Sequence, residues 1–207
     1  GYVFVRWTRD GAVLSDSSVL SVQVSEPMEL VAEFGVTATI AWRSEPAAGG
    51  SAALTVGSPS GLAGRAVTIT ATPASGHAFL HWLEGETVVS TENPWTLTLG
   101  SDRNLVAVFG ATARLELQAS PPAGGTVRVV AGELDGLAGR TVRLLASASA
   151  GYLHSGWIVD GAPVAVSDTI SIVVTRSMQV TGRFLAVTPA FIDRAARHLR
   201  GGSLLSE

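Results

Sequence analysis

The 207-residue chain contains no cysteine, and all 14 of its basic residues are arginine, so lysine is absent as well. Without cysteine there can be no disulfide, thiolate metal site or thiol nucleophile, and the apolar core alone must hold each folding unit together. Without lysine there can be no isopeptide cross-link, Schiff base or phosphate-loop lysine. The sequence also lacks any run near the roughly 18 apolar residues that a membrane span needs.

The charge gives no sign of binding to polyanions, since the formal net charge is −3 and the arginines are scattered along the chain. Nucleic acids and anionic membranes are bound by basic patches, so we expect neither as a partner. The sequence has no nucleophile elbow, phosphate-binding loop, paired-carboxylate phrase or calcium loop. We therefore predict that the protein is not an enzyme and has no catalytic residue, no metal and no cofactor.

What the chain does contain is one phrase written three times. The heptapeptides GYVFVRW, GHAFLHW and GYLHSGW begin at residues 1, 76 and 151, a period of 75 residues. An alternating run that ends in phenylalanine follows each of them. A solenoid repeat has only about 20–50 residues and must stack on its neighbours, whereas a unit of this length can close a core of its own. The chain is therefore predicted to be a tandem array.

Taking the phenylalanine as the end of a copy divides the chain into four parts. Residues 35–109 and 110–184 are then complete modules, residues 1–34 are the C-terminal half of another copy, and residues 185–207 form a tail. Period-two alternation, broken by proline and glycine turns, predicts about six strands in each complete module. The joints contain no flexible linker, which favours small β-rich modules arranged as an elongated rod.

Large aromatic side chains must supply much of the core of so small a module, because each buries about 150–250 Å². The recurring aromatics are predicted to be structural core anchors: Trp7, Trp82, Trp157, Phe34, Phe109 and Phe184. The glycines that open the repeated phrase suit corners where the backbone needs positive φ; they are Gly1, Gly76 and Gly151. The alternative is that the tryptophan rings are exposed and stack on sugars.

The repeated phrases resemble the divergent internalin-type B-repeat modules of bacterial cell-surface and secreted proteins. The resemblance covers residues 1–184 and rests on the order Gly-Gly, a Thr-Val strand, Gly-aromatic, Trp and a terminal Ala-x-Phe. Leu-Ala-Gly-Arg at 62–65 and 137–140 departs from the family's acidic Glu-Gly phrase, and Gly182 replaces an alanine. The resemblance implies a β-grasp-like fold, an extracellular or cell-surface setting, and a spacer or adhesive role without shared catalytic residues.

Both ends of the chain depart from the complete repeat. A half-module at 1–34 would expose strand edges, and one candidate for their cover is a neighbouring chain, by strand addition or module swapping. The alternatives are a boundary within a longer chain and a permuted arrangement in which 1–34 pair with 35–75. Thr188 as an N-terminal cap, with Pro189 after it, predicts a short amphipathic helix at about 189–200. Three roles are open for this helix: it docks a partner, it caps the last module, or it begins a further domain. Its apolar stripe contains the candidate contact residues Phe191, Ile192 and Leu199.

Two functions follow from these patterns. The first is a structural array in a bacterial extracellular stalk or filament, built by self-association or by neighbouring modules of a longer chain. The second is an adhesin-type binding module for a glycan or protein ligand. Trp42 and Trp95 lie outside the repeated phrase, and the third copy has Leu117 and Ile170 in their places, so they are the candidate ligand contacts for the second function.

Overall fold

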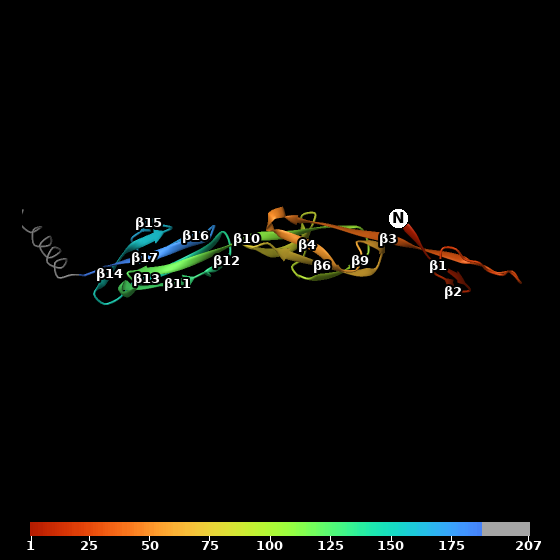
Figure 1. Cartoon of the computed structure of the whole chain (residues 1–207), viewed down its shortest axis with the longest axis horizontal. Coiled ribbons are helices and arrows are strands. Elements are labelled where there is room, and N and C mark those ends of the chain that lie inside the picture. Colours follow the sequence, from red (N-terminus) through yellow and green to blue (C-terminus); the bar gives the residue numbers. More distant parts are fainter. Residues whose placement is uncertain (188–207) are drawn as a thin grey trace, which may run out of the picture. The chain divides into compact units, whose positions relative to one another are not determined.

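The computed structural model describes residues 1–187, so the predicted helix at 189–200, with Phe191, Ile192 and Leu199, lies outside the described residues. Residues 1–187 form seventeen strands and two short 3-10 turns, with no α-helix among them (Figure 1). The prediction of an all-β to β-rich array of repeats is confirmed. The finer β-grasp-like arrangement stays a prediction.

The strands fall into two compact units, which divide between Gly110 and Ala111. The first unit contains β1 (Tyr2–Arg9), β2 (Ala12–Ser15), β3 (Val31–Glu45), the turn η1 (Ala47–Gly49), β4 (Gly50–Val56), β5 (Ser60–Leu62), β6 (Arg65–Pro73), β7 (His77–Glu84), β8 (Thr87–Ser90) and β9 (Trp95–Leu99). Strand β10 (Arg103–Ser120) runs without a break from the first unit into the second. The second unit continues with η2 (Pro122–Gly124), β11 (Gly125–Ala131), β12 (Asp135–Leu137), β13 (Arg140–Ala148), β14 (Tyr152–Val159), β15 (Ala162–Ala165), β16 (Thr169–Val174) and β17 (Met178–Ala186).

From the middle of β3 to the middle of β10, the first unit forms a module of two sheets. One is the antiparallel sheet β4-β6-β9, and the other runs in the order β8-β7-β10-β3-β5. Apolar side chains alternate along these strands, so each sheet turns one face to a common core. The buried core draws on both sheets and contains Ala38, Ile40, Val67, Ile69, Ala71, Trp82, Leu97, Leu99, Leu105, Ala107 and Phe109.

The second unit builds the same module with a core of its own. Its sheets are β11-β13-β16 and β15-β14-β17-β10-β12. The separate core contains Ala113, Leu115, Val142, Leu144, Ala146, Trp157, Ile172, Val174, Val180 and Phe184. In both modules the first and last strands are parallel neighbours, and Arg103 faces Ile40 as Met178 faces Leu115. Each of these pairs lies 75 residues from its counterpart, so the pairing register is the same in both modules.

Residues 1–36 form a smaller sheet of three strands. Strand β1 pairs with β2 and with the first residues of β3, as β14 pairs with β15 and β17 in the second unit (Figure 1). The two arrangements share a register shift, between Phe4 and Arg6 in one and between His154 and Gly156 in the other. Among the described residues, β1 and β2 pair with none of the strands β4, β5 and β6, so the pairing of 1–34 with 35–75 is limited to the contact of β1 with the start of β3.

Candidate interaction surface

An aromatic cluster lies at the centre of the complete module in the first unit. The ring centroid of Phe79 is 5.4 Å from that of Trp82 and 6.1 Å from that of Phe109. The indole N–H of Trp82 donates to the backbone oxygen of Glu92 at 3.0 Å, so the polar atom of the ring is satisfied inside the core. Trp82 is completely buried and Phe109 is 4% exposed.

The second unit repeats the cluster with one replacement. His154 takes the place of Phe79, and its ring centroid is 5.2 Å from that of Trp157 and 5.6 Å from that of Phe184. The Trp157 indole N–H donates to the backbone oxygen of Ser167 at 2.7 Å. Both Trp157 and Phe184 are buried. The His154 side chain is also buried, and its Nε2 has no hydrogen-bond partner among the described residues.

A corner with the sequence Pro-x-Ala-Gly-Gly closes over the phenylalanine in each complete module. The two corners are residues 46–50 and 121–125. A Cβ atom on Gly50 would lie 2.6 Å from Cε1 of Phe109, and one on Gly125 would lie 2.5 Å from Cε1 of Phe184. No side chain fits at these positions because each ring rests directly on the glycine backbone. The phenylalanine and the glycine pair therefore form one packing unit, which sequence reasoning had treated only as a turn.

Residues 1–36 carry the same aromatic cluster on an open sheet. The ring centroid of Phe4 is 5.7 Å from that of Trp7 and 5.9 Å from that of Phe34. Trp7 is only half-buried, and Phe34 is 61% exposed. The prediction that Phe34 is a buried core anchor is therefore wrong for the described chain. The physical reason is that no three-stranded sheet covers this face within residues 1–187.

Two corner glycines of the repeated phrase have the positive φ that glycine adopts more readily than any other residue. Gly76 and Gly151 have φ values of 76° and 80°. A Cβ atom would meet nothing within 4 Å at either position, so the backbone conformation rather than space selects glycine. Gly1 contributes its carbonyl oxygen, which accepts from the backbone N–H of Thr37 at 2.9 Å and from its hydroxyl at 3.2 Å.

Trp42 and Trp95, the candidate ligand contacts, pack on the first unit's core. Both are half-buried against the buried cluster. The Trp42 indole N–H donates to the backbone oxygen of Ala52 at 2.9 Å, and the Trp95 ring centroid lies 6.4 Å from that of Trp82. Both rings are thus part of the fold while keeping some exposed surface, and their role as ligand contacts stays a prediction.

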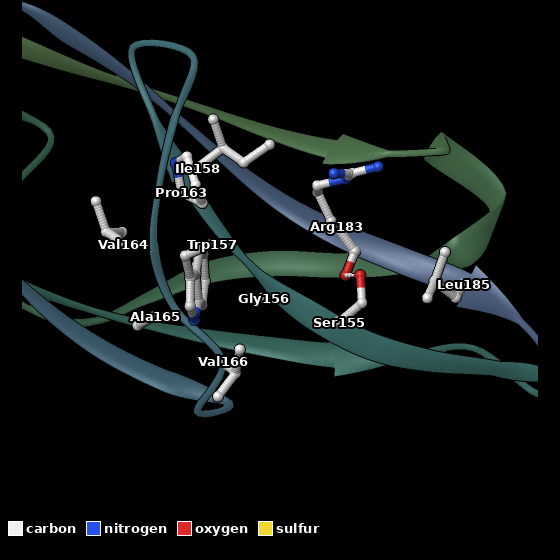
Figure 2. Close-up of a pocket in the computed structure, with 10 residues that line it drawn as sticks. All are labelled: Ser155, Gly156, Trp157, Ile158, Pro163, Val164, Ala165, Val166, Arg183 and Leu185. Carbon is white, nitrogen blue, oxygen red and sulfur yellow. Dashed lines mark hydrogen bonds between the residues drawn. The ribbon is translucent and has the colours of Figure 1, made fainter.

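An open groove of about 540 Å³ lies on the second unit, along strands β14, β15 and β17. Figure 2 shows Trp157 beside Ala165 on one side of it, with Arg183 and Leu185 on the neighbouring strand. Gly156 has a φ of 137°, and a Cβ atom there would lie 2.7 Å from the carbonyl oxygen of Ala165. The groove thus has mainly apolar walls and one guanidinium, with no set of converging polar groups that defines a ligand.

In each unit, the carboxylate of a turn residue accepts hydrogen bonds from a neighbouring strand. The Asp102 carboxylate accepts from the hydroxyl of Thr39 at 2.8 Å and from its backbone N–H at 2.7 Å, and these bonds lower the pKa of Asp102. The backbone N–H of Gln179 donates to Asp160 at 2.8 Å and, with the nearby Arg176, lowers the pKa of Asp160. The described part of the chain contains no group of three His, Cys, Asp or Glu residues that could hold a metal ion. Nor does it contain a helix long and apolar enough to span a membrane.

Two arginines that sequence reasoning did not single out hold the loop before the second strand of each three-stranded sheet. The Arg140 guanidinium donates to the backbone oxygens of Glu133, Leu134, Gly136 and Leu137. The Arg65 guanidinium donates to those of Ala38, Ser58 and Leu62. The signal was available, because both arginines end the repeated phrase GLAGR.

The fold and the recurring clusters define a class of protein: a tandem array of two-sheet β modules, each with an aromatic core. The family model for the divergent InlB B-repeat domain matches the chain twice, at residues 42–113 and 115–188. These matches cover more than half of the chain, so the chain belongs to the divergent InlB B-repeat family, and the predicted resemblance is confirmed. Domains of this family are typical of bacterial surface or secreted proteins. No curated protein matches the chain.

Proposed function

We propose that this chain is a non-catalytic structural array in a bacterial extracellular stalk or filament, in which neighbouring chains share strands or modules. Residues 35–109 and 110–184 act as the complete modules, and residues 1–34 act as the C-terminal half of another. The observation that carries the proposal is the parallel pairing of the first and last strands in each module. A stalk must resist tension, and this pairing determines how each module responds to tension.

In each module, tension enters at the beginning of the first strand and leaves at the end of the last one. Because the two strands are parallel neighbours, a pull along them loads the evenly spaced hydrogen bonds of the ladder together. An antiparallel pair pulled from its open end would instead lose its bonds one after another. The ladder covers six residue pairs in the second unit, from Leu115 with Met178 to Ser120 with Arg183. A ladder of this kind favours a load-bearing role.

Tension also passes from module to module without a linker. The first part of β10 pairs with β3, and the last part of the same strand pairs with β17. The last strand of one module is therefore continuous with the first strand of the next. A flexible linker would separate the two ladders, whereas one unbroken strand joins them.

Single-molecule pulling on the full chain tests the load-bearing role. Each complete module has 75 residues and should add up to about 250 Å of length when it opens. In β10 the N–H of Leu115 donates to Leu134 on one side, so by alternation the N–H of Gln118 faces β17. Gln118→Pro removes that donor and should lower the force of one opening event, whereas Gln118→Ala should leave both events unchanged. Modules that open at a low force insensitive to Gln118→Pro would contradict the proposal.

The location is tested on intact bacterial cells that express the protein. Antibodies against the second unit should label fibres or the cell surface in electron micrographs without permeabilisation. Labelling that requires permeabilised cells would contradict an extracellular stalk. An adhesin role stays the alternative, because Trp42 and Trp95 pack on the core but keep part of their surface exposed.

A further inference from the structure

Two exposed arginines, Arg128 and Arg143, are diagonal neighbours on the outward face of the second unit's three-stranded sheet. Strand β13 turns Val142 and Leu144 toward the core, so by alternation Arg143 and Leu145 lie on the opposite face. Arg128 faces Leu145 across the ladder between β11 and β13, which places it on that same face. Diagonal neighbours of this kind lie about 7–8 Å apart. Strand pairing thus brings together two cations that the sequence separates by 15 residues.

No acidic side chain of this sheet balances the two charges. Strands β11, β13 and β16 contain no aspartate or glutamate. Among residues 1–187, neither guanidinium has an ion pair, whereas Arg114 and Arg176 of the same unit lie 3.9 Å and 2.6 Å from carboxylate oxygens. Like charges on neighbouring positions of a sheet repel each other. The pair is therefore a local excess of positive charge in a chain whose formal net charge is −3.

The equivalent face of the first unit carries no such pair. Ala53 and Thr68 stand 75 residues before Arg128 and Arg143 and face outward on β4 and β6. The hydroxyl oxygen of Thr68 lies 2.8 Å from that of Thr96 on β9, so this face satisfies its own polar groups. Both modules form the same sheets around equivalent cores. The fold therefore does not require arginine at either position.

The surroundings of the arginine pair indicate what kind of anion fits. Across the ladder between β13 and β16, Ser171 lies opposite Arg143 and Thr169 lies opposite Leu145, which adds hydroxyl groups to the face. An extended peptide binds a sheet mainly through main-chain groups at an edge, whereas both arginines project from the face. A face with cations and hydroxyl groups instead suits a long polymer that carries anions and hydroxyl groups along its length.

We propose that this face of the second unit binds an acidic polysaccharide, whose carboxylate or sulfate groups accept hydrogen bonds from Arg128 and Arg143. The planar fork of a guanidinium matches such groups with two parallel hydrogen bonds. The inference goes beyond the load-bearing role, because it concerns a sheet that is not part of the parallel ladder. Both contacts are open to solvent, so binding should weaken as the salt concentration rises.

Titrations with two oligosaccharides test the proposal on the full chain. One probe is oligogalacturonate, which carries carboxylates, and the other is a heparin fragment, which also carries sulfates. At low ionic strength, at least one of them should shift backbone amide resonances of β11, β13 and β16 and leave those of β4, β6 and β9 unchanged. Raising the ionic strength to about 0.5 M should remove most of the shift. The methyl ester of oligogalacturonate has the same backbone without the charge and should not bind.

Arg128→Ala combined with Arg143→Thr installs the residues of the first unit. This double variant should bind about 10-fold more weakly or worse, because it loses the charged donors. Lysine at both positions keeps the charge but not the fork, so it should retain part of the affinity. Both side chains are exposed, and thermal unfolding should therefore be unchanged. Arg183→Ala is the matched control, since it removes an exposed charge from the other sheet of the same unit and should leave binding unchanged.

Four results would overturn the inference. The first is the absence of binding by both charged oligosaccharides at low ionic strength. The second is an unchanged affinity in the double variant, and the third is equal binding of the methyl ester. The fourth is binding of oligoglutamate through the same arginines as tightly as the oligosaccharides, which would assign the face to acidic peptides. None of these results bears on the opening force of the modules, so this proposal and the load-bearing proposal fail separately.

Discussion

Replacing the same residue type at two repeat positions should give very different losses of stability. Phe184 is 3% exposed and rests on the Gly125 backbone, so Phe184→Ala leaves a cavity and should cost about 3–5 kcal/mol of unfolding free energy. Phe34 occupies the equivalent position but is 61% exposed. It keeps mainly an edge-to-face contact with Phe4, which is worth about 0.5–1.5 kcal/mol. Phe34→Ala should therefore cost less than about 1.5 kcal/mol.

Calorimetry together with hydrogen exchange resolved by residue can assign each loss to its unit. For a module of this size, about 3 kcal/mol should lower the melting temperature of the second unit by about 12 °C or more. Amides of β13 and β16 should lose protection in Phe184→Ala and keep it in Phe34→Ala. Equal losses in the two variants would refute the reasoning, because they would mean that the Phe34 ring is buried in solution.

Three further predictions concern the turns and corners. Gly125→Val should destabilise the second unit by about 3 kcal/mol in denaturant unfolding, since no side chain fits below the phenylalanine ring. Arg140→Lys should cost about 1 kcal/mol and speed hydrogen exchange in its loop, because an ammonium cannot reach the same set of carbonyl oxygens. The bonds from Thr39 hold the pKa of Asp102 below its usual value, so its contribution is present above about pH 3.9 and is lost as the pH falls through the lowered pKa. Asp102→Ser should remove this acid sensitivity but keep the turn, because Ser177 already accepts the equivalent backbone bond in the second unit.

The long strands and the core anchors of the two complete modules could be predicted because their signals are strong in the sequence itself. Period-two alternation over five or more residues marks β6 and β13, and the fixed spacing of Trp82 and Trp157 marks equivalent places in equivalent cores. The short strands β5 and β8 were not predicted, since three or four residues carry too little alternation to be distinguished from a turn. Their positions depend on pairing with β3 and β7, which is tertiary information.

The exposure of Phe34 could not be read from its own segment. The run that ends at Phe34 has the same pattern as the runs that end at Phe109 and Phe184. What differs is the presence of a covering sheet, and the first two of its three strands are encoded well before the phenylalanine, at 50–73 for Phe109 and at 125–148 for Phe184. Local sequence can therefore identify a side chain suited to burial, but only the rest of the module determines whether it is buried.

The replacement of Phe79 by His154 yields the last prediction. His154 has a buried Nε2 without a partner in the described residues, and an unsatisfied buried polar atom costs about 1–3 kcal/mol. The His154 Nδ1 lies 3.2 Å from a carboxylate oxygen of Asp168. Because the Asp168 side chain is 73% exposed, this contact contributes only about 0–1 kcal/mol to stability. His154→Phe should therefore raise the unfolding free energy of the second unit by about 1 kcal/mol, and thermal unfolding should show the gain. Phe79→His, the reverse substitution at the equivalent position of the first unit, should lower the unfolding free energy of that unit. A loss of stability in His154→Phe would mean that the Asp168 contact outweighs the buried nitrogen, which is possible only if that carboxylate is far less hydrated than its exposure indicates.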